Sequence, residues 1–232
     1  MTQRVVGNPI ITFIDFLSIV IGAYGFHSTI LTLPLPPHLV DAGHWQFLTN
    51  LSLVYSLAVF VVGFIAHITK SERLFSLKNN LHPIGLALES IVTMVYWPLR
   101  LFCLRLLVED TSLYPIPMSA DLAIHLMPVI SLLIDYLVFM PRWKIRTRTA
   151  FGICFALTAA YWCLLEYLVD VENGSSYPYA FLNVPHNGLR ALIFVIVGGS
   201  AFVQFLLMSK IYSVLVKSPQ DSTIEDISKK EI

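Results

Sequence analysis

The sequence predicts an all-α, polytopic membrane protein: a bundle of six transmembrane helices with both termini in the cytosol. Hydrophobic residues make up 56% of its 232 residues and charged residues only 13%, whereas a typical soluble domain carries about 25% charged residues. The chain also contains six apolar runs, each long enough for the ~20 residues that cross a bilayer. Its basic residues gather in the loops on one side of these runs, as expected for cytosolic loops.

The composition also excludes several classes of protein. Fifteen Lys plus Arg balance fifteen Asp plus Glu, so no positive field attracts nucleic acid. The chain is too apolar for a disordered or collagen-like protein. Its three cysteines lie inside apolar runs, where we expect them to pack as small apolar side chains and not as a disulfide framework.

The apolar runs are expected to be helices, because they are continuous and do not alternate with a period of two. They cover residues 10–31, 46–68, 83–108, 118–140, 149–169 and 189–216. Pro98 and Pro128 fall inside two of these runs and are expected to kink them. We expect one domain over residues 1–216 and a flexible cytosolic tail over residues 217–232.

The loops show which side of the membrane each faces. The loop after the second run holds Lys70, Arg73 and Lys78, and the loop after the fourth holds four basic residues: Arg142, Lys144, Arg146 and Arg148. The opposite loops, residues 32–45 and 109–117, contain no Lys or Arg. Because basic loops stay in the cytosol, this asymmetry predicts cytosolic termini.

Two short motifs agree with that orientation. Asn173-Gly174-Ser175 is an N-glycosylation sequon in an outer or lumenal loop. Lys229 and Lys230 stand fourth and third from the end of the printed sequence, as in a dilysine retrieval signal. Such a signal is read on a cytosolic tail by coat-protein retrieval machinery. These features predict a multipass protein of the endoplasmic reticulum membrane.

Ionisable residues at membrane depth are functional candidates, because burying a charge in lipid is costly. Those inside the runs include Asp15, Glu89, Asp121, His125, Asp135 and Glu166. Thr49 and His125 lie near the starts of the second and fourth runs, which both enter from the outer face. The two side chains are therefore expected at similar depth. Asp121, four residues before His125, shares its helix face and could hold the imidazole in one tautomer.

A hydroxyl, an imidazole and a carboxylate are the parts of a nucleophilic hydrolase. Arg100, Arg105 and Arg190 lie at the same membrane surface and could receive a lipid carboxylate. Spacing alone leaves a structural role open for both main candidates, because a membrane threonine often bonds to its own helix and a membrane histidine is often structural. No metal and no organic cofactor is expected.

Three segments carry a stronger resemblance. They are residues 44–49 (HWQFLT), residues 121–125 (DLAIH) with Asp135 ten residues further on, and residues 177–179 (YPY) with residues 187–190 (NGLR). They resemble the signatures of the androgen-induced protein family, which includes the androgen-dependent tissue-factor-pathway-inhibitor-regulating protein. The chain looks like a fungal-type or other distant member, and the resemblance extends from about residue 10 to residue 216.

The characterised members of that family are multipass threonine hydrolases that split fatty acid esters of hydroxy fatty acids. The resemblance therefore implies Thr49 as nucleophile and His125 as base, with Asp121, Asp135, Asn50 and Trp45 as orienting or pocket residues. The lipid substrate would enter from the bilayer. His44 and the early Pro128 depart from the family pattern and could reshape the pocket.

Three other functions are compatible with the sequence. The chain could be a small-molecule or ion transporter that uses its intramembrane acids, although no matching pair of halves is visible. It could also be a non-catalytic lipid-binding membrane protein. A third alternative is a metal-assisted hydrolase using His125, Asp121 and other histidines.

Overall fold

The computed structural model describes residues 4–108 and 116–216. Within these residues, six helical segments are long and apolar enough to cross a membrane, which confirms the all-α, six-span prediction. The helices are α1 (Pro9–Phe26), α2 (Leu48–Thr69), α3 (Glu72–Phe102), α4 (Met118–His125), α5 (Met127–Ile134), α6 (Thr147–Leu168) and α7 (Asn187–Leu215). The fourth span consists of α4, α5 and a π-helical turn, Asp135–Phe139.

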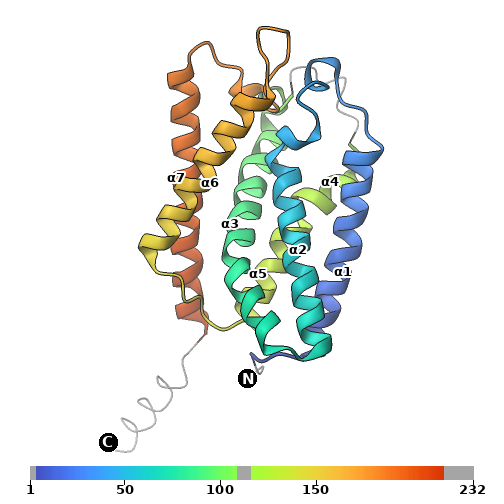
Figure 1. Cartoon of the computed structure of the whole chain (residues 1–232), viewed down its shortest axis with the longest axis vertical. Coiled ribbons are helices and arrows are strands. Elements are labelled where there is room, and N and C mark those ends of the chain that lie inside the picture. Colours follow the sequence, from blue (N-terminus) through green and yellow to red (C-terminus); the bar gives the residue numbers. More distant parts are fainter. Residues whose placement is uncertain (1–3, 109–115, 217–232) are drawn as a thin grey trace, which may run out of the picture.

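The spans form a bundle with a flanking pair (Figure 1). Helices α1, α2 and α3 pack with the span formed by α4 and α5. Helix α7 packs against the other side of α3 and also against α6, so α6 and α7 are the flanking pair. Helix α1 begins and α7 ends at the same end of the bundle. The α1–α2 and α6–α7 loops lie at the opposite end. The predicted tail at 217–232, with Lys229 and Lys230, lies outside the described residues.

Helix α3 is longer than the sequence indicated. The predicted start at residue 83 is wrong, because the helix begins at Glu72, where the Ser71 hydroxyl accepts a hydrogen bond from the Leu74 amide at 3.4 Å. The polar stretch before residue 83 is helical, and Lys78 within it is buried. Lys78 is therefore not a loop residue, and the basic asymmetry that sets the orientation depends on the other loop residues.

The fourth span is broken, as predicted for Pro128. Helix α4 ends at His125, Leu126 leaves the helical conformation with φ −131°, and α5 begins at Met127. At this break the His125 carbonyl accepts hydrogen bonds from Thr93 Oγ1 at 2.6 Å and from Trp97 Nε1 at 3.2 Å. Neighbouring side chains thus satisfy a backbone group of the interrupted helix. Helix α3, in contrast, continues through Pro98 to Phe102.

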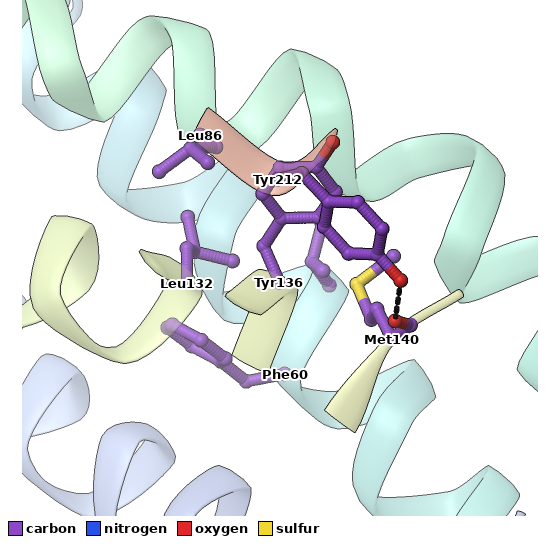
Figure 2. Close-up of a cluster of buried hydrophobic side chains, with 7 residues drawn as sticks. Phe60, Leu86, Leu132, Tyr136, Met140 and Tyr212 are labelled. Atoms are coloured by element: carbon purple, nitrogen blue, oxygen red, sulfur yellow. Dashed lines mark hydrogen bonds between the residues drawn. The ribbon is translucent and has the colours of Figure 1, made fainter. Parts of the chain in front are cut away.

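An apolar cluster of large side chains fills the half of the bundle near the termini. Figure 2 shows its side chains, which are Val59, Phe60, Leu86, Leu132, Tyr136, Met140 and Tyr212. The Tyr212 hydroxyl donates a 2.9 Å hydrogen bond to the Met140 carbonyl. Close packing of these large side chains fixes the spans relative to one another.

At the end of the bundle opposite the termini, a glycine of α1 sets the position of α4. A Cβ atom at Gly25 in α1 would lie 2.6 Å from Ile124 Cγ2 and 3.2 Å from the Ala123 Cβ. Glycine therefore permits the close approach of α4 to α1, as small residues do at membrane helix interfaces. This contact places the adjacent residue, His125.

Candidate active site

Thr49 lies in the first turn of α2, which begins at Leu48 after the extended residue Phe47. The start of this helix has no capping side chain of its own. The backbone amides of Leu48 and Thr49 instead interact with the hydroxyl of Tyr179, from the α6–α7 loop. Thr49 is buried at this point, so a protected hydroxyl lies beside the partly positive end of a helix.

Two groups beside Thr49 are neutral near pH 7. Burial raises the pKa of the Tyr179 phenol, and its interactions with Thr49 and the Tyr161 hydroxyl oppose that rise only in part. The phenol therefore keeps its proton and can donate a hydrogen bond. Partial burial lowers the pKa of His44, so its imidazole is uncharged.

His125 is held by a carboxylate on its own helix. The distance from His125 Nδ1 to Asp121 Oδ1 is 2.9 Å, and both side chains are buried. Because a carboxylate accepts hydrogen bonds, Nδ1 carries the proton and Nε2 presents a lone pair. The Tyr96 hydroxyl donates a short hydrogen bond to the same carboxylate, and Arg100 Nε lies 3.5 Å from its other oxygen.

Tyr96 also fixes the plane of the imidazole. Its ring stacks on that of His125, with centroids 3.4 Å apart and an interplanar angle of 5°. The stack and the carboxylate contact together leave the His125 ring little freedom. An imidazole restrained in this way is suited to proton transfer at Nε2.

Thr49 and His125 line the same cavity, at the end of the bundle opposite the termini. The space is about 600 Å³ and is bordered by α2, α3, α4 and three connections, those between α1 and α2, between α3 and α4, and between α6 and α7. Its lining residues include Thr29, His44, Phe47, Thr49, Asn50, Tyr96, Ile124, His125 and Tyr179. Two spans thus bring a hydroxyl and an imidazole to one cavity.

A second, more apolar cavity of about 950 Å³ begins at the same place. Thr49, Tyr96, Leu107 and Tyr179 line both cavities. From there the second cavity runs between α3, α6 and α7 as far as Ala87, Cys154 and Ala201. At 1.5 Å per residue, the nine residues from Tyr96 to Ala87 span about 13 Å of membrane depth.

The other predicted pocket residues differ in their roles. Asn50 is buried and lines the first cavity, where its Nδ2 donates a 2.7 Å hydrogen bond to the His44 carbonyl. Trp45, in contrast, is 48% exposed on the short turn before α2. Asn50 thus supports the backbone before Thr49, and Trp45 faces outward.

The three arginines predicted to receive a carboxylate are not gathered together. Arg190 is buried and its guanidinium donates to the Tyr177 hydroxyl at 2.7 Å and to Asn187 Oδ1 at 3.1 Å, with Glu166 at 3.4 Å. Arg105 is exposed on the turn after α3. Arg100, as described above, lies next to Asp121. Among the described residues, none of the three lines either cavity.

The remaining acids lie elsewhere. Asp135 forms an ion pair with Lys78 in the half of the bundle near the termini, so Asp121 and not Asp135 contacts His125. Glu89 accepts a 2.8 Å hydrogen bond from Ser56, and Glu166 pairs with Arg190. In the parts of the chain described here, no three His, Cys, Asp or Glu side chains form a group that could hold a metal ion.

Comparison with known proteins decides the family. The model of the FAR-17a/AIG1-like protein family matches residues 10–213. The chain belongs to this family. It is 35% identical over 191 residues to the UPF0641 membrane protein YHR140W of Saccharomyces cerevisiae, a match covering 76% of this chain and 80% of the yeast protein.

A second relative comes from fission yeast. The UPF0641 membrane protein PJ4664.05 of Schizosaccharomyces pombe is 33% identical over 135 residues, covering 58% of this chain and 60% of the relative. No solved structure matches the chain. Both relatives are named as membrane proteins, in agreement with the six spans.

Two residues in this FAR-17a/AIG1-like chain were not predicted as site residues. Tyr179 belongs to the YPY segment that already resembled the family, so its position next to Thr49 could have been inferred from that resemblance. Tyr96 had no comparable sequence pattern, because its stack on His125 joins two helices that lie side by side only in the folded bundle.

Proposed function

We propose that this protein is an intramembrane carboxylic ester hydrolase that splits fatty acid esters of hydroxy fatty acids. Thr49 is the nucleophile and His125 the base. The observation that carries the proposal is that these two residues, from separate spans, line one cavity, and that His125 Nδ1 lies 2.9 Å from Asp121 Oδ1. The resemblance to threonine hydrolases supports the same roles.

The reaction begins when His125 Nε2 takes the proton of the Thr49 hydroxyl. Thr49 Oγ1 then attacks the ester carbonyl and forms a tetrahedral oxyanion, to which Tyr179 donates a hydrogen bond. When the intermediate collapses, the leaving oxygen of the hydroxy fatty acid takes the proton from Nε2, and an acyl-threonine remains. Water, deprotonated by His125, releases the acyl group as a fatty acid and restores Thr49.

The two cavities fit the two parts of such an ester. The apolar cavity between α3, α6 and α7 accommodates the acyl chain, since almost all of its lining is aliphatic or aromatic. The cavity beside His125 accommodates the hydroxy fatty acid. The scissile bond then lies at Thr49, where the cavities meet. A branched ester is the lipid whose two chains diverge at such a point.

The substitution Ala201→Phe tests the acyl cavity. Because Ala201 lies at its deep end, a phenyl ring there is expected to lower kcat/KM for long acyl chains by about 10–100-fold, as loss of apolar pocket contacts does. Short acyl chains are expected to be hydrolysed within about threefold of the wild-type rate. The measurement is kcat/KM over a series of branched esters that differ in acyl length.

The matched control is Val203→Phe, which places the same ring on a lipid-facing position of α7 that is 61% exposed. It should leave the chain-length profile unchanged. If Ala201→Phe reduced the rates for short and long chains equally, the acyl chain would not occupy this cavity.

The activity itself is tested with purified, full-length protein in detergent. A branched fatty ester should be converted to equal amounts of fatty acid and hydroxy fatty acid, and a fluorophosphonate probe should label the protein and block that release. Folded protein that neither releases acid nor reacts with the probe would favour a non-catalytic, lipid-binding role.

We propose the endoplasmic reticulum membrane as the location. The support is the Lys229–Lys230 pair in the sequence, which coat-protein retrieval machinery would bind, and the position of the sequon. Asn173 is exposed in the α6–α7 loop, where its side chain donates a 2.6 Å hydrogen bond to Asp170. Microscopy of the full chain with both lysines replaced by serine should show movement out of the endoplasmic reticulum.

A further inference from the structure

A second group of charged side chains is buried far from the active site, in the half of the bundle near the termini. Lys78 of α3 forms a short ion pair with Asp135 at the start of the π-helical turn. Asp15 of α1 lies close to the same pair. Each of the three side chains is only 1% exposed. Buried charges of this kind are rare in membrane spans and mark functional sites.

Asp15 lacks the partner that a buried carboxylate needs. Neither of its oxygens has a hydrogen-bond partner among the described residues. Gly63 of α2 leaves room for this carboxylate, since a Cβ there would lie 2.6 Å from Asp15 Oδ2 and 3.4 Å from Lys78 Cε. The carboxylate thus points into the interior of the bundle, next to the lysine side chain, without a donor.

The two nearby histidines do not supply the missing positive charge. His67 Nδ1 accepts a 3.0 Å hydrogen bond from the Gly7 amide, so this imidazole is neutral. His82 Nε2 lies 3.0 Å from the Leu132 carbonyl and 3.5 Å from Asp135 Oδ2, and its Nδ1 has no partner among the described residues. A protonated His82 would therefore bury an N–H group without an acceptor, which is unfavourable.

The charges of the group consequently do not balance. The ionised forms of Asp15 and Asp135 carry two negative charges, whereas Lys78 carries one positive charge. An uncompensated charge inside the bundle is strongly unfavourable. We propose that Asp15 and Asp135, beside Lys78, form an intramembrane binding site for a single monovalent cation, either Na⁺ or a proton.

The test measures the thermal stability of purified, full-length protein in detergent. Ligands that bind only the folded state raise Tm. If the site binds Na⁺, NaCl at about ten times its Kd should raise Tm by about 3–6 °C relative to choline chloride. If it binds a proton, Na⁺ has no such effect. In choline chloride Tm should then fall as pH rises, because Asp15 loses its proton while buried.

Asp15→Asn is the decisive variant, because it keeps the shape of the side chain and removes the charge. It should abolish the Na⁺ effect, or flatten the pH dependence and remove a protonated-carboxyl band from the infrared spectrum. Either result supports the site and identifies the cation. If wild type and Asp15→Asn respond identically to Na⁺ and to pH and show the same carboxyl band, the proposal is wrong.

Two further variants keep the test informative. Lys78→Gln removes the internal positive charge, so the response to Na⁺ or to pH should increase, and an unchanged response would also contradict the site. Glu89→Gln is the matched control, since Glu89 is buried in α3 and hydrogen-bonded to Ser56, apart from this group. It should remove at most its own infrared band and leave the Na⁺ response of the protein intact.

Discussion

Replacing Thr49 by alanine is expected to lower kcat for ester hydrolysis by about 10⁴-fold or more, as loss of a catalytic nucleophile does in other hydrolases. The substitution removes the Oγ1 atom that attacks the carbonyl and leaves the cavity shape almost unchanged. KM should change little, because the acyl chain contacts other residues of the two cavities. The measurement is the rate of fatty acid release from a branched ester, with membrane insertion confirmed for each variant.

Thr49→Ser sharpens this prediction. It keeps a hydroxyl but loses the β-methyl group that restricts the threonine rotamer, so activity should fall by about 10–100-fold and the acyl-enzyme should still form. The matched control is Thr69→Ala at the far end of the same helix, where an exposed hydroxyl bonds to the Ile65 carbonyl. Near-wild-type hydrolysis by Thr49→Ala would show that another group attacks the ester.

The spans could be predicted from sequence because a membrane helix requires only a sufficiently long run of consecutive apolar residues. A run of apolar residues long enough for the bilayer must be helical to satisfy its own backbone, and the break at Pro128 follows from proline's missing N–H group. The Asp121–His125 contact was also accessible, because residues four apart share a helix face. Rules that apply within a single helix therefore predicted the Asp121–His125 part of the candidate site.

Contacts between spans were not accessible in this way. Lys78 resembled a cytosolic loop residue, because nothing in its neighbourhood in the sequence indicates that Asp135 lies opposite it in the bundle. The same reason explains why Asp135 remained a candidate partner for His125, and why Arg190 was assigned to a substrate and not to Glu166 and Tyr177. Hydropathy reports depth in the membrane but not which helices are neighbours.

Asp121→Asn is expected to lower kcat by about 10³–10⁴-fold, although it changes only one oxygen to an NH₂ group. The ionised carboxylate accepts the Nδ1 proton of His125 and leaves Nε2 free to act as base. An asparagine can instead donate its NH₂ group to Nδ1, which moves the imidazole proton to Nε2. Nε2 then carries the proton and cannot accept one from Thr49. In other hydrolases, loss of the correct histidine tautomer lowers kcat by a factor of this size.

Kinetics of single and double variants separate this role from simple loss of structure. Because Asp121 acts only through His125, adding Asp121→Asn to His125→Ala should lower kcat no further. Asp170→Asn makes the same chemical change on the exposed α6–α7 loop and should retain full activity. If the two site substitutions instead multiplied in their effects, Asp121 would act on the substrate independently. The role of His125 as a base oriented by this carboxylate would then have to be abandoned, even if Thr49 remained the nucleophile.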